Sequence, residues 1–313
     1  MSEKKLISIV TPCYNEEENV EDLHIQITQI MSELSGYEFE HIYIDNASTD
    51  RTIPILRRLA AADKRVKVII NARNFGHIRS PYYGLLQASG DAVILMVSDF
   101  QDPPYLIKEY IEKWEKGYKV VMGVKSRSKE SWFLFVLRTL YYRILRKLSD
   151  IRLVENFTGF GLYDRRVVEV LRKIDDPYPY LRGLVADIGF DAAKIEFLQP
   201  ARKRGITKNN FYTLFDIAML GLTNNTKVPL RLAIMFGFLV ASISFAVGLF
   251  YLLYKLFNWQ SFEVGLAPLV VGLSFLGGVQ LIFLGIIGEY IGAIYTQVLH
   301  RPLVIEKERI NFD

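Results

Sequence analysis

Two acids and an amide follow an apolar run in the middle of the chain. Asp99, Gln101 and Asp102 come directly after the apolar residues 92–97, and two prolines follow them. Carboxylate and amide oxygens suit a hard divalent cation, which commonly shares its site with the phosphate oxygens of a substrate. The alternative is a polar turn at the start of a helix, since proline favours the first helical turn.

Strand-like and helical patterns alternate from residue 5 to about residue 125. Strands are expected over residues 6–11, 39–44, 66–70, 92–97 and 119–124, and helices over 15–34, 48–62 and 80–88. This alternation is typical of an α/β domain with a mostly parallel sheet and helices on both faces. In such sheets the ligand binds at the carboxyl ends of the strands, where the polar clusters 12–16, 45–50 and 99–102 fall.

Composition and missing motifs narrow the function. The 313 residues carry a mild net charge of +4, and the single cysteine excludes an intrachain disulfide or a cysteine-based metal cluster. The chain has no GxxxxGK[ST] loop and no clear GxGxxG after the first strand, which disfavours a P-loop ATPase and a dinucleotide-binding enzyme. A cation at the acidic cluster would stabilise a diphosphate as a leaving group, so a nucleotide-diphosphate substrate is predicted.

Two long apolar segments towards the C-terminus predict transmembrane helices. They cover residues 229–257 and 264–287, and each exceeds the roughly 20 residues needed to cross a bilayer. Basic residues lie before the first segment and after the second, whereas the connection near 258–263 has none. The positive-inside rule then places both termini in the cytoplasm and the chain in the cytoplasmic membrane. The expected units are a cytoplasmic domain at 1–228, a membrane pair at 229–291 and a cytoplasmic tail at 292–313.

Residues 131–148 form a separate amphipathic pattern. The segment SWFLFVLRTLYYRILRKL has apolar residues at helical spacing and four basic residues among them. Such a pattern is typical of a helix that lies in a membrane surface, with aromatic and basic residues at headgroup level. The alternative is an amphipathic helix packed on the protein core. The two apolar segments downstream favour the membrane interpretation.

Four motifs together resemble those of a known enzyme family. They are IVTPCYNEEENV, YIDNASTDRT, NFGHIRSPYYGLLQASGDAVILMVSDFQDPP and RKRGITK. In combination they resemble family 2 glycosyltransferases of the GT-A fold, and the resemblance covers nearly the whole chain. The two apolar segments narrow it to membrane-anchored polyprenyl-phosphate glycosyltransferases, which are similar to dolichol-phosphate mannose synthase and to bacterial enzymes that load glucose on undecaprenyl phosphate.

The resemblance implies a donor, an acceptor and a set of site residues. Asp99 and Gln101 would hold Mg²⁺ or Mn²⁺. The donor, with UDP-glucose as the best expectation, would lie against Pro12, Tyr14, Glu16, Asp45, Asn46, Ser98, Asp99 and Gln101. The phosphates of the donor and of the acceptor, expected to be undecaprenyl phosphate, would contact Arg127, Arg138, Arg204 and Lys208.

The implied reaction is an attack by the lipid phosphate on the anomeric carbon. The phosphate oxygen would displace the nucleoside diphosphate in line and invert the anomeric centre. An anionic phosphate hardly needs a general base, so catalysis would depend on positioning and on charge stabilisation at the leaving group. Asp187 and Glu155 are candidate catalytic acids that would orient the acceptor or the sugar, and their alternative readings are a helix-surface acid and a loop acid. For Arg204 and Lys208 the alternative is a juxtamembrane anchor on anionic lipid.

The chain departs from the family pattern at two places, and other functions stay open. Asn46 follows Asp45 where the family often has two adjacent acids, and Val97-Ser98-Asp99 stands where it often has Asp-x-Asp. One alternative is a processive polysaccharide synthase of the same fold, whose Gln-x-x-Arg-Trp motif this chain lacks. The other is a non-catalytic membrane scaffold, for which the two departures are the only support. The presence of Asp99, Gln101, Arg204 and Lys208 argues against a scaffold.

Residues outside the motifs give further expectations. His77 either touches the donor or is a structural histidine, and Cys13 is read as a small packing residue. The apolar segments have no central charge, so an anchor is favoured over a pore, and a separate flippase and a downstream glycosyltransferase are expected partners. A homo-oligomer is also expected, because small residues let membrane helices pack closely: Gly272, Gly277, Gly278 and Gly285. No nucleic-acid partner is expected.

Overall fold

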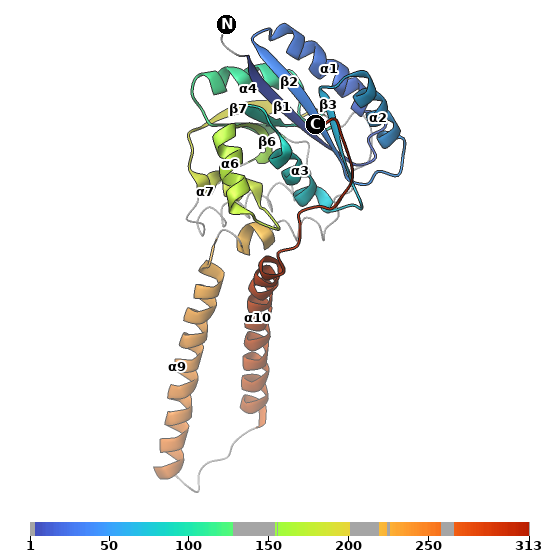
Figure 1. The fold of residues 1–313 in the computed structure, drawn as a ribbon. Coiled ribbons are helices and arrows are strands. Elements are labelled where there is room, and N and C mark those ends of the chain that lie inside the picture. Colours follow the sequence, from blue (N-terminus) through green and yellow to red (C-terminus); the bar gives the residue numbers. More distant parts are fainter. Residues whose placement is uncertain are drawn as a thin grey trace.

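The computed structural model describes residues 4–127, 154, 156–200, 219–223, 226–257 and 266–312 of the chain. Eight strands form one sheet with the order β7-β5-β6-β4-β1-β2-β3-β8, and two long helices extend away from it (Figure 1). The amphipathic segment 131–148 lies outside the described residues.

The first five strands and the first three helices follow one another along the chain as the sequence predicts, whereas the sequence patterns did not predict β6, β7, β8, α4, α6 and α7. The strands are β1 (Lys5–Cys13), β2 (Tyr37–Asp45), β3 (Val66–Asn71), β4 (Ala92–Leu95), β5 (Val120–Arg127), β6 (Phe157–Asp164), β7 (Ala192–Leu198) and β8 (Glu306–Ile310). The helices are α1 (Val20–Glu33), α2 (Thr52–Ala62), α3 (Gly76–Gln87), α4 (Leu106–Glu115), α6 (Arg165–Ile174), α7 (Leu181–Ile188), α9 (Val228–Phe257) and α10 (Leu266–Leu299).

The central strands are parallel and buried on both faces. β1 pairs in parallel with β2 and with β4, and β2 pairs in parallel with β3. Their near-continuous runs of buried residues are what strands covered on both sides require. Only β6 and β8 pair antiparallel to their neighbours, β6 with β4 and β5, and β8 with β3, among the described strands. The predicted α/β class with a mostly parallel sheet is confirmed.

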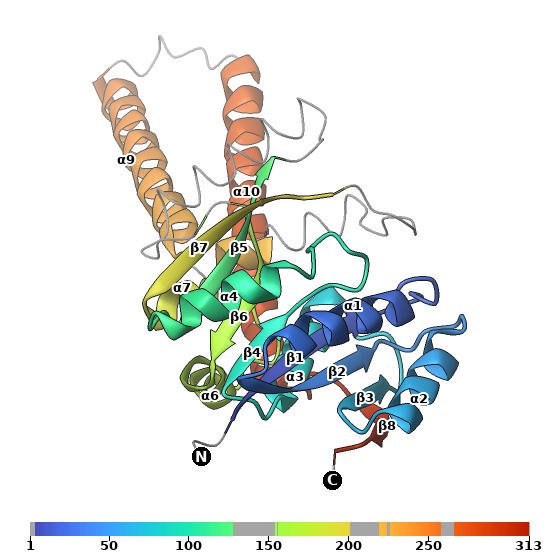
Figure 2. The same cartoon turned by 90° about the horizontal axis from the view of Figure 1, so that it is seen from above.

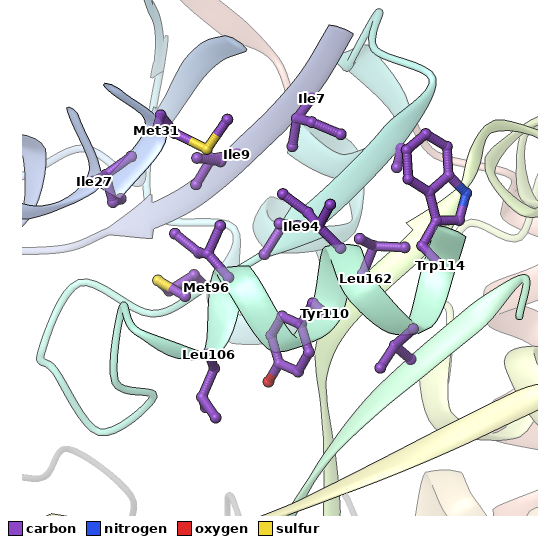
Figure 3. Close-up of a cluster of buried hydrophobic side chains, with 14 of the residues drawn as sticks. Ile7, Ile9, Ile27, Met31, Ile94, Met96, Leu106, Tyr110, Trp114 and Leu162 are labelled. Atoms are coloured by element: carbon purple, nitrogen blue, oxygen red, sulfur yellow. The ribbon is translucent and has the colours of Figure 1, made fainter. Parts of the chain in front are cut away.

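Helices cover both faces of the sheet (Figure 2). The helices α1, α2 and α4 lie on one face, and α3, α6 and α7 lie on the other. Because side chains alternate along a strand, β1 sends Ile7 and Ile9 into the first core and Val10 into the second. Figure 3 shows part of the first core, where Tyr110 and Trp114 of α4 lie under the strands with Ile94. These two apolar layers hold the strand ends at fixed positions.

Three helices begin at other residues than the sequence pattern predicts. The helix expected from residue 48 begins at Thr52, because Ser48 and Asp50 belong to the loop that bonds to the loop after β1. The helix expected from residue 15 begins at Val20, because Asn15 adopts a left-handed φ of 56° and its neighbours bond to another loop. The helix expected from residue 80 begins four residues earlier, at Gly76. The side chain of Asn46, the residue after β2, bonds to Asn74 and Phe75 just before this helix and fixes the earlier start.

The two apolar helices are long and exposed. α9 has 30 residues and α10 has 34, so each measures about 45–50 Å at 1.5 Å per residue. Their most apolar stretches, Val228–Phe250 and Phe275–Leu299, have mean hydropathies of 2.3 and 1.6 and are not buried by the rest of the protein. A core helix of a soluble domain would be buried, so these helices indicate membrane association.

The last residues return to the sheet. α10 continues to Leu299, beyond the expected span 264–287, because the apolar pattern persists past a few polar side chains. Within the segment expected as a tail, residues 292–313, β8 then pairs with β3 as the edge strand of the sheet (Figure 1). Asn311, with a φ of 60°, donates from Nδ2 to the carbonyl oxygens of Ala60 and Val66, both at 2.8 Å.

Replacing Asn311 is expected to destabilise the protein. Asn311→Gly keeps the left-handed backbone accessible but loses the two bonds to backbone carbonyl oxygens, which contribute about 2 kcal/mol together, and the exposed bond that Lys64 Nζ donates to Asn311 Oδ1 at 3.1 Å. Asn311→Ala loses the same bonds and adds backbone strain. Thermal unfolding in detergent measures the effect, and a melting temperature of Asn311→Gly equal to that of the unmodified protein would contradict it.

Two histidines lie in the core beside β1. His24 and His41 place their Nδ1 atoms 3.4 Å apart, and His41 Nε2 lies 3.0 Å from Thr11 Oγ1. Burial lowers the pKa of both side chains, and the neighbouring His24 lowers that of His41 further. Both histidines are therefore neutral in the folded protein at neutral pH.

This pair predicts a loss of stability in acid. Once unfolded, each histidine titrates near pH 6.5, so below that pH the unfolded chain binds more protons than the folded one. The free energy of unfolding therefore falls as the pH drops below about 6.5. Melting at pH 7.5 and pH 5.5 is expected to show a smaller acid-induced drop for His41→Gln than for the exposed control His300→Gln. Equal drops would contradict the assignment.

Candidate active site

The carboxyl ends of β4, β1 and β2 meet at one edge of the sheet. In the parallel register, Pro12 lies opposite Ile44, and Cys13 lies opposite Asp45. The chain moves outwards from β1 to β2 and β3 and then returns to the other side of β1 with β4. Such a reversal of strand order opens a crevice at the carboxyl edge, which is where open α/β sheets bind ligands. The polar clusters after β1, β2 and β4 border this crevice.

The loops after β1 and β2 are bonded to each other. The backbone N–H of Asn15 donates to Ser48 Oγ at 2.9 Å, and Asn15 Oδ1 accepts from the N–H of Thr49 at 2.8 Å. The N–H of Glu16 donates to Thr52 Oγ1 at 2.8 Å. The reciprocal bonds make one rigid wall from two loops that lie more than thirty residues apart in the sequence. Pro12 and Tyr14, both half-buried, belong to this wall.

Asp45 is completely buried at the end of β2. Its Oδ1 accepts from the N–H of Ser48 at 2.8 Å, and its Oδ2 accepts from Ser48 Oγ at 2.5 Å. Burial raises the pKa of Asp45, while the bonds from Ser48 oppose that shift. The carboxylate is thus held within the protein at the end of β2.

The acidic cluster forms a tight turn beyond β4. Asp99 Oδ1 accepts from the N–H of Gln101 at 3.1 Å, and the buried Phe100 between them has a left-handed φ of 60°. Ser98 Oγ donates to the carbonyl oxygen of Pro12 at 3.4 Å, which ties this turn to the end of β1. The turn therefore lies directly beside the wall formed by the first two loops.

The electrostatics of this turn favour a cation. Asp102 is 3% exposed. Burial raises its pKa to about 7; the ammonium group of Lys125 opposes the shift, and the negative charge of Asp99 adds to it. Two acids and the amide oxygen of Gln101 match the donor set of a hard divalent ion that completes its shell with phosphate oxygens and water. The described residues hold no cluster of three or more histidine, cysteine, aspartate or glutamate side chains around one point, so such a site needs oxygens from a substrate.

The structure places the predicted site residues in three groups. Those at the carboxyl edge of the sheet are Pro12, Tyr14, Glu16, Asp45, Asn46, Ser98, Asp99 and Gln101. Arg127 ends β5, where it pairs with Leu198 of β7. Asp187 lies on α7 with an exposed side chain. The predictions for Arg138, Glu155, Arg204 and Lys208 fall outside the described residues.

Several residues at this edge were not singled out from the sequence. Ser48 holds Asp45, and Asn15 closes the wall through its side chain and its left-handed backbone. Asparagine and serine in a short polar loop are typical of such turns, so a turn could have been predicted but not its partner. Lys125 acts on Asp102 from β5, and no sequence signal connects the two.

Cys13 lies at the carboxyl edge of the sheet, and His77 lies in the helix that follows β3. Burial raises the pKa of Cys13 well above its usual value, and the charge of Asp45 adds to the shift, so the thiol stays protonated and is a poor nucleophile. Partial burial lowers the pKa of His77, and the positive charge of Arg182 lowers it further. His77 lies in the first turn of α3, which follows β3.

Comparison with known proteins shows the family to which this chain belongs. Residues 8–172 match the model of glycosyl transferase family 2. The glycosyltransferase YkcC of Bacillus subtilis is 36% identical over 97% of this chain and 94% of its own length. The bactoprenol glucosyl transferase of Shigella phage SfV is 36% identical over 96% of this chain and 98% of its own length.

The chain is also similar to proteins of known structure. Glucosyl-3-phosphoglycerate synthase from Mycobacterium tuberculosis, solved with Mn²⁺, UDP and phosphoglyceric acid, has a TM-score of 0.49 and 20% identity over 70% of this chain and 76% of that one. The family match and the full-length relatives define the class: this is a glycosyltransferase. The chain belongs to glycosyl transferase family 2, as its motifs predict.

The arrangement around Asp99 predicts metal-dependent nucleotide binding. Asp99→Asn keeps an oxygen for the N–H of Gln101 but removes the charge that attracts a cation. The Mn²⁺-dependent gain in UDP affinity is expected to fall at least about tenfold, because such cations are held by only one or two carboxylates. The control Asp91→Asn changes an acid at the opposite end of the same strand, where Asp91 Oδ2 accepts from the N–H of Leu6 at 2.8 Å. Calorimetric titration of UDP with and without Mn²⁺ measures this gain in affinity. An equal gain in Asp99→Asn and in the control would contradict the assignment of the cation to Asp99.

Proposed function

We propose that this protein transfers glucose from UDP-glucose to undecaprenyl phosphate at the cytoplasmic face of the membrane. The observation that carries the proposal is the likeness over nearly the full chain to bactoprenol glucosyl transferases of Shigella phages, at 34–36% identity. That likeness spans both the polar edge of the sheet and the two exposed apolar helices. In this proposal the sugar nucleotide binds at the polar edge, and the lipid acceptor binds near the apolar helices of the same chain.

The nucleoside part of the donor is assigned to the wall after β1 and β2. Pro12, Tyr14 and Glu16 lie on one side of this wall and Asp45 on the other. The diphosphate is assigned to the turn after β4, where Asp99 and Gln101, with Ser98 beside them, would hold Mg²⁺ or Mn²⁺. That ion would supply charge neutralisation at the leaving diphosphate. The donor set of the turn supports this assignment.

The acceptor is assigned to the boundary between the sheet domain and the apolar helices. A cavity of about 430 Å³ lies there between residues 219–223 and the end of α10, lined by Tyr178, Leu220, Gly292, Ala293 and Thr296 among others. Its apolar lining residues, such as Leu220 and Ala293, would contact the first isoprene units of a polyprenyl phosphate, whereas Thr223, Glu289 and Gln297 make the rest of the lining polar. For contacts to the phosphates of the donor and the acceptor we propose Arg127, Arg138, Arg204 and Lys208.

The proposed reaction is an in-line displacement. The lipid phosphate oxygen forms a bond to the anomeric carbon, the bond to the diphosphate breaks, and UDP leaves with the electron pair. The anomeric centre inverts, so an α-linked donor gives a β-linked lipid sugar. Because the phosphate is already anionic, the protein contributes orientation and charge stabilisation. We assign orientation of the acceptor or the sugar to Asp187 and Glu155.

The membrane arrangement extends this proposal. With α9 and α10 as a transmembrane pair, residues 1–228 and 292–313 lie in the cytoplasm, consistent with the basic residues that flank the pair. β8 packs on the sheet, so the residues after α10 lie on the same side of the membrane as the domain. A homo-oligomer, a separate flippase and a downstream glycosyltransferase complete the proposed setting.

Transfer by the purified protein tests the function. The protein in detergent, with radiolabelled UDP-glucose, undecaprenyl phosphate and Mn²⁺, is expected to yield labelled lipid. Asp99→Ala is expected to lower the rate by at least about 100-fold, since a cation at the leaving group contributes several kcal/mol. A labelled lipid that Asp99→Ala forms at the same rate would contradict the metal site. Labelled polysaccharide would support a processive synthase, and neither product nor UDP binding would support a scaffold.

A further inference from the structure

The side-chain amide of Asn46 makes four hydrogen bonds, two as acceptor and two as donor. Its Oδ1 accepts from the N–H of Phe75 at 2.8 Å and from Asn71 Nδ2 at 3.2 Å. Its Nδ2 donates to Asn74 Oδ1 at 2.9 Å and to the carbonyl oxygen of Gly76 at 3.1 Å. Asn46 is 7% exposed, so these four bonds are made inside the protein. A buried group with all its bonds satisfied holds its neighbours firmly.

Asn46 joins three segments of the chain at the polar edge. Its own N–H donates to the carbonyl oxygen of Cys13 at 2.9 Å, which connects the ends of β1 and β2. Its side chain reaches the loop between β3 and α3, residues 71–76. That loop is also held from its far side, where the N–H of Ala72 donates to the carbonyl oxygen of Ile305 at 2.8 Å.

The loop 71–76 carries groups that matter at the edge. Gly76 has a φ of 87°, and its N–H donates to Asn74 Oδ1 at 2.8 Å, which starts α3. The guanidinium group of the exposed Arg73 lies 4.0 Å from the centre of the Phe75 ring and donates to the carbonyl oxygen of Asn74 at 3.0 Å. The loop thus borders the residue that follows β2, and it carries the exposed positive charge of Arg73.

We infer that Asn46 is a positioning residue for the nucleotide, which acts by fixing the loop 71–76 as the outer border of the nucleoside site. The inference rests on the proposed function for the identity of the nucleotide. The bonding pattern explains why an amide is needed. An amide both donates and accepts, whereas a carboxylate at this position would direct an oxygen at Asn74 Oδ1 and at the carbonyl oxygen of Gly76. Because neither of these two oxygens carries a proton, both would repel the carboxylate oxygen.

Asn46→Asp and Asn74→Ala test this inference, with the KM values for both substrates and kcat as the readout. Asn46→Asp is expected to raise the KM for UDP-glucose about tenfold or more, while the KM for undecaprenyl phosphate and kcat change less than about twofold. Asn74 is exposed, so Asn74→Ala folds readily and is expected to shift the KM for UDP-glucose in the same direction. Because one of the four side-chain bonds of Asn46 goes to Asn74, the effects of Asn46→Ala and Asn74→Ala are expected to be less than additive in the double variant.

A matched control separates positioning from stability. Tyr82→Phe removes a buried hydrogen bond from α3, where the Tyr82 hydroxyl donates to the carbonyl oxygen of Leu171 at 3.0 Å. It is expected to lower the melting temperature and leave the KM for UDP-glucose unchanged. A KM for UDP-glucose that stays unchanged in Asn46→Asp and Asn74→Ala, or that rises equally in Tyr82→Phe, would overturn the inference.

Failure of this inference can be distinguished from failure of the proposed function. If the unmodified protein transfers glucose and the variants keep its KM for UDP-glucose, the inference fails and the function stands. If the unmodified protein transfers none, titration of UDP with Mn²⁺ replaces the kinetics. Weaker binding of UDP by Asn46→Asp then supports the positioning role. Equal binding by the variants, or no binding by any form, overturns it.

Discussion

The parallel pairing of β4, β1 and β2 is the constraint on which the rest of the structure depends. It brings three chain segments to one edge, although they are separated by more than thirty residues each. The strands can be parallel only because helices bury both faces, so the two apolar cores fix where the polar loops meet. Hydrogen bonds between the loops, such as those of Ser48 and Ser98, then complete the edge.

The same edge combines opposite electrostatic demands. Asp45 is satisfied within the protein by Ser48, and Asn46 by the loop 71–76, so these two side chains are fixed before any ligand arrives. The turn with Asp99 and Asp102 is different, because burial raises the pKa of Asp102 and the two negative charges oppose each other. Preorganised polar groups on one side, and two neighbouring acids with the Lys125 ammonium group near one of them on the other, are what the proposed site for a sugar nucleotide and its metal would use.

Local patterns predicted the first five strands and the two apolar helices, since burial of a strand on both faces leaves a continuous apolar run and a helix suited to a membrane leaves a longer one. They failed where distant contacts decide. The left-handed Asn15 delays α1, the bonds from Asn46 advance α3, and the polar segment of β8 becomes a strand only because β3 offers an edge. The polar clusters of the site were predictable as carboxyl-end loops, but their mutual bonds were not, because pairing between loops has no local signature.

The location of the metal and the nucleotide is the central claim, and one measurement tests it most directly. A crystal structure of the full chain with UDP and Mn²⁺, collected with anomalous scattering from manganese, locates the ion without reference to activity. The account predicts an anomalous peak bonded to the carboxylate of Asp99 and to the diphosphate, with the uracil against the wall that contains Asp45. A manganese peak remote from Asp99, or a nucleotide bound away from the carboxyl edge of the sheet, would contradict it.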